Sequence, residues 1–275
     1  MGQLSDLWGP LGPAFEGMGW SAEVHDRLRE AARRLPRVGA FGLEVHPGLG
    51  RVDLALQLWP GGRATDQAFW SLSGRDRALL PEGVAGFLDR WRSTPGLHDP
   101  GTSAFVEIDL DGSARPPSLF LAFGAPPSPE LLARAAVVVG LSVQQGERIA
   151  AWARERGAIV RHVGARALER GVEARVSANS LSDGILWWND LRAVAVTVGF
   201  GLDAAKEMAV RGVELKPLGG WPALEEALRA RGVELADTAA WSGAVAGGRL
   251  FRNHLKLDPE GRRAKVYLGV GVGRD

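Results

Sequence analysis

The sequence predicts an α+β protein in which an antiparallel β-sheet is strongly curved or closed into a barrel, with helices packed on its outer face. Most predicted strands occur in hairpins whose residues alternate between an aliphatic and a polar face, which is typical of antiparallel sheets rather than of buried parallel sheets. Amphipathic helices separate the hairpins and are suited to covering the aliphatic face. With about eight to ten strands, closure would also remove the exposed sheet edges.

In the first half of the chain, turn and cap residues delimit the elements. Ser21 is a helix cap, the turn Pro47–Gly50 separates two strands, and Ser128-Pro129-Glu130 has the N-cap, first-turn proline and acidic residue of a helix start. Gly157 is a C-cap candidate. The predicted helices are 21–35, 81–93 and 128–156, the last with a break near Gly140. The predicted strands are 38–46, 51–59, 103–110 and 118–123.

The second half continues with strands and shorter helices. The predicted strands are 159–163, 172–177, 193–200, 250–257 and 264–272, the last two joined by the turn Asp258-Pro259-Glu260-Gly261. The predicted helices are 202–211 and 221–231. No low-complexity linker divides the chain, so we predict a single α+β domain over residues 1–275, with residues 1–20 as an irregular N-terminal arm.

The polar faces of the predicted strands carry the candidate ligand-binding residues. These faces mix large aromatic side chains, Phe105 and Phe120 among them, with charges of both signs, which suits a wet, ligand-sized cavity better than open solvent. An open sheet with a solvated polar face is the alternative that the alternation leaves open. The predicted ligand-binding residues are Glu44, His46, Trp59, Glu107, Asp109, Arg175, His254, Lys256, Lys265 and Tyr267.

Composition excludes several classes of protein. A net charge of +1 is not that of a protein that follows a nucleic-acid backbone, and the absence of cysteine excludes disulfide scaffolds and thiolate zinc sites. No apolar run has the length of a membrane helix, and the N-terminus does not have the pattern of a secretory signal. The five histidines are not at metal-ligand spacing. We therefore expect a cytoplasmic protein without a metal, a cofactor, a membrane or a nucleic-acid partner.

Three local patterns have a functional and a structural interpretation. Residues 199–204 fit G-x-G-x-x-A between a predicted strand and a predicted helix, as in a dinucleotide site, although a glycine turn before an ordinary helix explains them as well. Glu107 and Asp109 are either a carboxylate pair with a raised pKa or partners of arginine and water. Of the adjacent Trp187 and Trp188, one is a candidate contact for a peptide or an aromatic ligand, unless both are packed in the core.

Two segments resemble the ABBA-type prenyltransferases. Phe105–Asp111 with Pro117–Phe123, followed by the helix from Ser128, resembles one α-β-β-α unit of that family, and His254–Asp258 with Ala264–Leu268 resembles its Lys-x-Tyr strands. The resemblance implies a closed antiparallel barrel with outer helices and an aromatic or peptide acceptor in the lumen. It also implies that Lys256 and Lys265 lie on the side of a prenyl diphosphate and that Tyr267 is a tyrosine of the shield around the allyl cation. Arg175 joins this set by its face alone.

The sequence departs from that family in two ways. It has a single tyrosine, which cannot form a shield, and Glu44, Asp53, Glu107 and Asp109 on the predicted inner face oppose a diphosphate. We therefore expect a peptide-binding relative from the biosynthesis of a ribosomally made, modified peptide, possible partners being the other enzymes of that pathway. The alternatives are a peptide or aromatic prenyltransferase and a nucleotide-dependent α/β enzyme. Whether the chain is an enzyme stays open.

Overall fold

The fold was analysed in a computed structural model. It describes residues 40–48, 52–58, 83–98, 101–109, 116–168, 171–179, 193–202, 207–238 and 250–270, together with Asp26. The strands are β1 (Ala40–Val45), β2 (Val52–Leu58), β3 (Thr102–Asp109), β4 (Ser118–Phe123), β5 (Ile159–Ala167), β6 (Val172–Asn179), β7 (Ala193–Leu202), β8 (Met208–Pro217), β9 (Glu234–Leu235), β10 (Leu250–Leu257) and β11 (Arg263–Val270). The helices are α5 (Val84–Ser93), α6 (Pro129–Val138), α7 (Val143–Arg156) and α8 (Trp221–Ala230).

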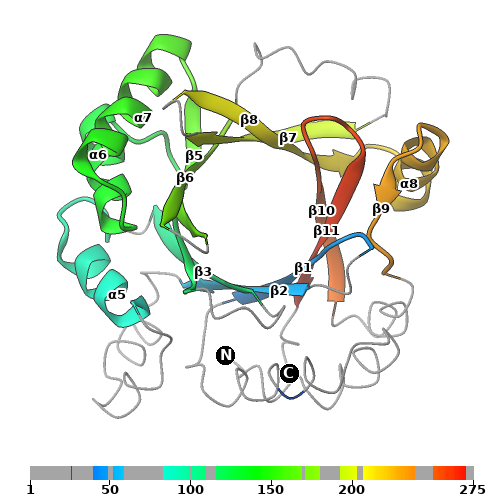
Figure 1. Cartoon of the computed structure of the whole chain (residues 1–275), viewed down its shortest axis with the longest axis horizontal. Coiled ribbons are helices and arrows are strands. Elements are labelled where there is room, and N and C mark those ends of the chain that lie inside the picture. The colour runs from blue at the N-terminus through cyan, green and yellow to red at the C-terminus, as the bar shows by residue number, and fades with distance from the viewer. Residues whose placement is uncertain are drawn as a thin grey trace.

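All of the described strands except β9 form a closed antiparallel barrel. Each strand pairs with the next in the order β1 to β8, β10 and β11, and β1 pairs back to β11 through partners such as Leu43 and Leu268. Figure 1 shows this ring viewed through its centre. The short β9 adds a parallel pairing beside Arg263 at one end of β11. The predicted fold class, an antiparallel barrel with helices on its outer face, is confirmed.

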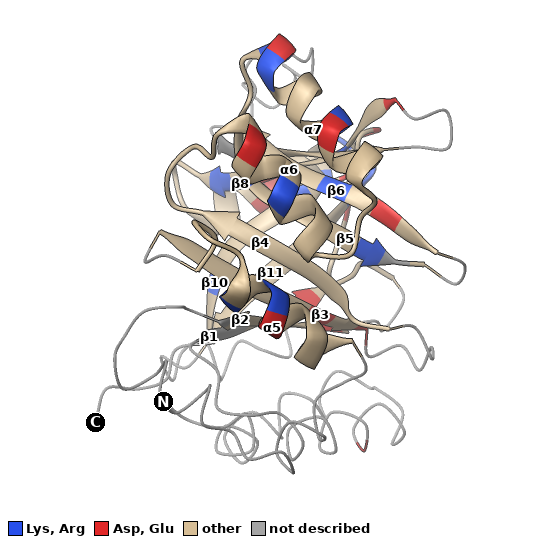
Figure 2. Ribbon diagram, turned by 90° about the vertical axis from the view of Figure 1, so that its left-hand side faces the viewer, with Lys and Arg blue, Asp and Glu red and all other residues tan. Residues whose placement is uncertain are grey.

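The helices lie outside the barrel. Figure 2 shows α5, α6 and α7 along one side of the strands. The helical stretch predicted from Ser128 is broken near Gly140 as expected: the Ser128 hydroxyl accepts a hydrogen bond from the Leu131 amide at the start of α6, and Ser142 begins α7 with a capping box. Gly157 ends α7 with a left-handed φ of 59°, a conformation that favours glycine.

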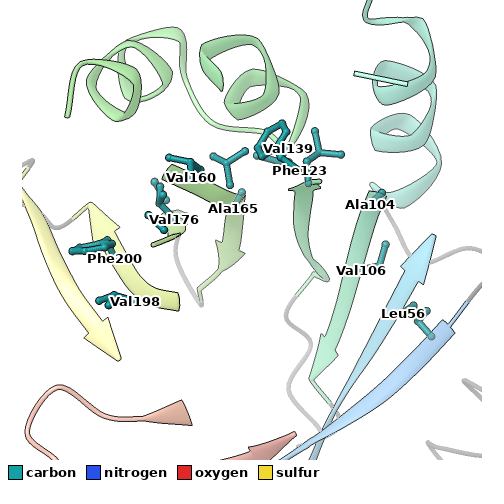
Figure 3. Packing of buried hydrophobic residues seen from close by; sticks show 14 of the residues in the cluster. Leu56, Ala104, Val106, Phe123, Val139, Val160, Ala165, Val176, Val198 and Phe200 are labelled. Carbon is teal, nitrogen blue, oxygen red and sulfur yellow. The ribbon is translucent and has the colours of Figure 1, made fainter. Parts of the chain in front are cut away.

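The apolar core fills the space between the outer face of the barrel and the helices. Figure 3 shows Val160, Val176 and Phe200 on strands facing α6 and α7. Trp152 of α7 packs against Phe200, with ring centroids 4.7 Å apart. Because the aliphatic side chains of each strand point outward into this core, the alternate side chains point into the barrel.

The helix predicted over residues 202–211 is wrong. Among the described residues, β7 continues to Leu202 and β8 begins at Met208, so the described part of the expected helix is β-strand. Alanine, glutamate and methionine favour a helix here, but pairing between β7 and β8 overrides that preference. The glycines of the G-x-G pattern instead permit close approach inside the barrel, because a Cβ on Gly201 would lie 2.7 Å from an oxygen of Glu173. The described residues therefore give the dinucleotide hypothesis no strand-to-helix turn.

Several predictions fall outside the described residues. These are the N-terminal arm 1–20, the helix 21–35 apart from Asp26, which is helical, the side chain of Trp59, and the pair Trp187 and Trp188. Among the described helices, none has the length and apolarity needed to cross a membrane.

The outer core predicts a stability difference between two aliphatic positions. Leu121 on β4 is fully buried, whereas Val143 at the start of α7 is 62% exposed. Leu121→Ala is expected to lower the free energy of unfolding by about 2–5 kcal/mol, because it leaves a cavity beneath the helices. Val143→Ala is expected to change it by less than about 0.5 kcal/mol. Urea denaturation of both variants checks this, and equal losses would contradict the packing described.

Candidate functional site

The barrel encloses a cavity of about 800 Å³, a size typical of sites for small ligands. Its wall is built from inward-facing side chains of β1 to β8, β10 and β11 and from the turn between β10 and β11. Among the described residues, the charged and aromatic ones that line it are Glu44, His46, Phe105, Glu107, Phe120, His162, Arg166, Arg175, Phe200, Arg211, Glu214, Lys216, Phe251, His254, Lys256, Asp258, Glu260, Arg263, Lys265 and Tyr267.

The structure brings most of the predicted site residues together in this lumen. Eight of the ten line the cavity: Glu44, His46, Glu107, Arg175, His254, Lys256, Lys265 and Tyr267. Asp109 is not among the lining residues but lies beside Asp53 of β2 and Glu107 of its own strand. Trp59 is outside the described residues. The alternation of polar and aliphatic residues therefore predicted a shared interior, whereas a ligand-binding role for these residues stays a prediction.

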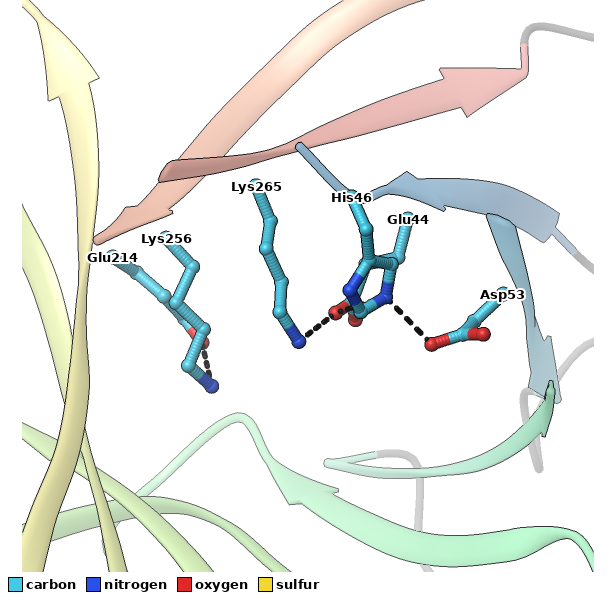
Figure 4. Close-up of polar contacts among 6 residues, drawn as sticks. All are labelled: Glu44, His46, Asp53, Glu214, Lys256 and Lys265. Carbon is cyan, nitrogen blue, oxygen red and sulfur yellow. Dashed lines mark hydrogen bonds and ion pairs between the residues drawn. The ribbon is translucent and has the colours of Figure 1, made fainter. Parts of the chain in front are cut away.

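A buried cluster of opposite charges lies where β1 meets β2 and β11. Lys265 Nζ donates a hydrogen bond of 2.5 Å to Glu44 Oε1. His46 Nε2 lies 2.8 Å from Asp53 Oδ2 and 3.2 Å from Glu44 Oε1 (Figure 4). Glu44 and Asp53 are at most 2% exposed. We call Glu44, His46, Asp53 and Lys265 the acid–histidine cluster.

The pKa values in this cluster follow from its contacts. Desolvation acts to raise the pKa of Glu44, but the charge of Lys265 and the hydrogen bond from His46 outweigh it and hold that pKa well below its usual value. Desolvation acts to lower the pKa of His46, but its hydrogen bonds to Asp53 and Glu44 raise it overall. The cluster therefore favours an ionised Glu44 and a histidine that is readily protonated.

The two carboxylates and the imidazole of the cluster have a geometry that suits a metal ion. Ligand atoms of Glu44, His46 and Asp53 lie within 4.8 Å of one another, and the same holds for Asp53, Glu107 and Asp109. In the first group, however, the ammonium of Lys265 already contacts Glu44, so a cation is supplied by the chain itself. The arrangement is that of an internal ion pair network.

Glu107 differs from the carboxylates of this cluster. It is half-buried, lines the cavity, and makes no hydrogen bond or ion pair with any residue that the structure describes. Desolvation, together with the negative charges of Glu44 and Asp53, raises its pKa to about 7. A raised pKa was one of the two interpretations of Glu107 and Asp109, but the neighbouring charges that raise it are those of Glu44 and Asp53 and not that of Asp109.

Arginines gather on the strands β5, β6 and β8. Glu173 accepts contacts of 2.8 Å from Arg175 and 3.0 Å from Arg211. Nε of Arg175 is buried without a hydrogen-bond partner among the described residues. Arg166 lines the cavity and makes no ion pair with a residue in the described ranges. We call Arg166, Arg175 and Arg211 the arginine group.

Lys256 forms a looser ion pair elsewhere in the lumen. Its Nζ lies 3.8 Å from Glu214 Oε1, and the two residues are register partners on β10 and β8 (Figure 4). The side chain lies against two glycines. A Cβ on Gly199 would lie 3.3 Å from its Nζ, and a Cβ on Gly212 would lie 3.2 Å from its Cε. Both lysines that the family resemblance placed beside a diphosphate thus have carboxylate partners.

Aromatic rings line two parts of the wall. His254 and Tyr267 stack with centroids 4.2 Å apart, and Phe105 meets His162 edge-on at 5.7 Å. Phe120 lies over Gly164, where a Cβ would be 2.0 Å from its ring. Desolvation lowers the pKa of His162 and of His254, and raises that of Tyr267 well above its usual value with help from Glu44. The lumen therefore favours uncharged rings beside its ion pairs.

On β5 and β8, sequence reasoning missed five charged residues of the wall. They are His162, Arg166, Arg211, Glu214 and Lys216. Continuing the alternation along β5, with Val163 and Ala165 in the core, would have placed His162 and Arg166 inside. The other three lie on β8, part of which was predicted to be a helix.

The sequence and the structure were compared with those of known proteins. No model of a known protein family matches the sequence, and no curated protein matches it. Among solved structures, the chain is similar to AnaPT from Neosartorya fischeri, with a TM-score of 0.48 and 11% identical residues. The match covers 94% of this chain and 91% of that chain. A likeness at this level says nothing about activity, so the functional inference rests on the residues of the lumen.

The pKa of Glu107 predicts how one substitution depends on pH. An unfolded chain ionises this carboxyl near its ordinary pKa of 4.5, whereas the folded protein keeps it protonated up to about 7. Its contribution is therefore favourable at low pH and is lost as pH rises from 4.5 through 7. Glu107→Gln is expected to match the parent at pH 5 and to exceed its free energy of unfolding by about 1–3 kcal/mol at pH 8.

Urea denaturation at both pH values measures the difference between variant and parent. Glu226→Gln on the exposed face of α8 is the matched control and should show no such pH dependence. A Glu107→Gln variant that is less stable than the parent at pH 8 would show that the ionised carboxylate is stabilised in the fold.

The acid–histidine cluster predicts coupling between Glu44 and Lys265. Lys265→Met removes the ammonium and leaves Glu44 buried and ionised, at an expected cost of about 3–5 kcal/mol. Adding Glu44→Gln is expected to recover part of that loss, since the uncompensated charge is then gone. Lys216→Met, at an exposed lysine of β8, is the control. A double-mutant cycle by chemical denaturation tests this, and additive losses would show that the two residues do not interact.

Proposed function

We propose that the chain binds a peptide or a small aromatic molecule in the lumen of its barrel, as a binding protein in the biosynthesis of a modified peptide. The observation that carries the proposal is the cavity of about 800 Å³, whose wall combines aromatic rings with charges of both signs. Rings such as Phe105 and Phe120 offer apolar faces, and the ion pairs beside them offer partners for polar groups of the same ligand. A peptide side chain with its backbone presents both kinds of surface.

The charge pairing in the lumen favours such a ligand over a diphosphate. Lys265 is bound to the buried Glu44, and Lys256 faces Glu214. A diphosphate at these lysines would meet the two carboxylates at close range, and like charges in a poorly hydrated site repel strongly. A peptide, by contrast, brings amide groups and charges of both signs.

A second candidate function is transfer of a prenyl group, as in the family that the sequence resembles. The arginine group favours it, because guanidinium groups are suited to binding phosphate oxygens, and Nε of Arg175 is without a partner among the described residues. Tyr267 stacked on His254 would offer one aromatic face to a carbocation, which is less than a shield.

Calorimetric titration with a tryptophan-containing peptide and with dimethylallyl diphosphate separates the two functions. The peptide is expected to bind saturably. Ala55→Trp, at a small inward-facing residue of β2, is expected to weaken peptide binding at least tenfold, about 1.4 kcal/mol, because the new ring fills the lumen. Val143→Trp adds the same ring on the exposed surface of α7 and should leave binding unchanged.

Two results would count against peptide binding in the lumen. One is a peptide affinity that Ala55→Trp leaves intact, which would place the peptide elsewhere. The other is saturable binding of dimethylallyl diphosphate alone that is lost in Lys256→Ala, which would favour prenyl transfer.

A further inference from the structure

A group of carboxylates and the arginine group lie on different strands of the barrel. The carboxylates Glu44, Asp53 and Glu107 come from β1, β2 and β3. The arginine group comes from β5, β6 and β8. Figure 1 shows β1 to β3 on one side of the ring and β7 and β8 on the other. We call β1 to β3 the acidic side and β5, β6 and β8 the basic side, although Glu173 and Glu214 also place carboxylates on the basic side.

Within the acidic side, Glu107 faces the cavity and has no partner among the residues that the structure describes. Lys265 and His46 contact Glu44, and His46 contacts Asp53, so those two charges are compensated from within the chain. Glu107 has neither a hydrogen bond nor an ion pair in the described part of the chain. Its desolvation beside two negative charges makes a cation the partner that would suit it best.

Within the basic side, Arg166 and Arg175 have N–H donors without an acceptor among the described residues. Arg166 has no ion pair among the residues described, and the buried Nε of Arg175 has no acceptor there. A terminal nitrogen of the Arg175 guanidinium lies 2.8 Å from a carboxylate oxygen of Glu173, so only part of the guanidinium is paired. An anion in the lumen would supply acceptors to both guanidinium groups.

The two sides lie near each other without touching. The charges of Arg166 and of Glu107 act on each other strongly enough to affect the pKa of Glu107, and Glu107 acts in the same way on Arg175. No described ion pair joins Glu107 to either arginine. Phe105 and His162, in edge-on contact, also line the cavity and come from β3 and β5, the strands of Glu107 and Arg166.

We propose that the lumen binds a dipolar ligand, with an ammonium group on Glu107 and a carboxylate on Arg166 and Arg175, such as a short peptide with both termini free. This inference rests on the proposed binding function and adds the chemical class of the ligand. The aromatic contact between Phe105 and His162 accepts an apolar side chain of the same ligand. A ligand of this kind satisfies the acidic and the basic groups at once, with no net charge brought into the barrel.

Calorimetry with four forms of one tripeptide tests the inference. The probes are Gly-Trp-Gly with free termini, its N-acetyl form, its C-terminal amide, and the form blocked at both ends, all at pH 7.5. The free tripeptide is expected to bind at least tenfold more tightly than either singly blocked form, because each block removes one charge.

Two variants assign each terminus to its side of the lumen. Glu107→Gln is expected to remove the preference for a free amino terminus and to keep the preference for a free carboxylate. Arg166→Gln is expected to do the opposite. Glu226→Gln and Arg229→Gln, at exposed residues of α8 that do not line the cavity, are the matched controls and should keep both preferences. If Arg166→Gln does not fold, Arg175→Lys, which keeps the charge but loses Nε, should weaken the carboxylate preference alone.

The outcomes separate this inference from the proposed function. Equal binding of all four forms would overturn the dipolar ligand while leaving peptide binding in place. Tighter binding of the doubly blocked form would do the same. Failure of every form to bind would count against both. Loss of both preferences in the two control variants would show that the preferences follow the overall charge of the protein and not the lumen, and would overturn the assignment.

Discussion

The pairing of β1 with β11 is the constraint on which the rest of the structure depends. Without it, the described strands would form an open curved sheet whose polar face meets water. With it, the polar face becomes an interior, and its charges must find partners inside the ring. The ion pair between Glu44 and Lys265 joins these two strands at the closure itself. The same two strands therefore close the barrel and compensate its buried charge.

Glycines at inward positions make room for large side chains in the lumen. Some long side chains of the lumen lie directly against inward positions that carry no Cβ. Gly164 leaves that room for the ring of Phe120, and Gly199 leaves it for Lys256. The same absence of side chains that made residues 199–204 resemble a phosphate loop in the sequence serves the packing of the lumen.

How far the sequence predicts this site depends on the regularity of each strand. Strict alternation along β1 and β11 correctly placed Glu44, Lys265 and Tyr267 inside the barrel. On β10 the register shifts between Arg252 and His254, so that Phe251 and His254 both line the cavity although their positions differ in parity. A local bulge of this kind has no clear signature in composition, and it breaks any argument based on a period of two.

The strands β7 and β8 show a second limit of sequence reasoning. Their register shifts twice, and β8 begins with residues that favour a helix. Arg211 and Glu214 therefore could not be assigned to a face of the sheet. In the structure, Arg211 belongs to the arginine group and Glu214 is the ion-pair partner of Lys256. Local preference lost to pairing with neighbouring strands, which only the whole ring determines.

The partly compensated interior is also what gives the lumen a chemical preference. A barrel lined by aliphatic residues would bind any apolar molecule of the right size, and one lined by fully paired charges would offer a ligand little to gain. Here the acid–histidine cluster compensates the deepest carboxylates, which leaves Glu107 and Arg166 without described partners on strands that flank β4. Because each unpaired group is disfavoured until an opposite charge arrives, binding energy is concentrated on ligands that carry both charges at a matching separation.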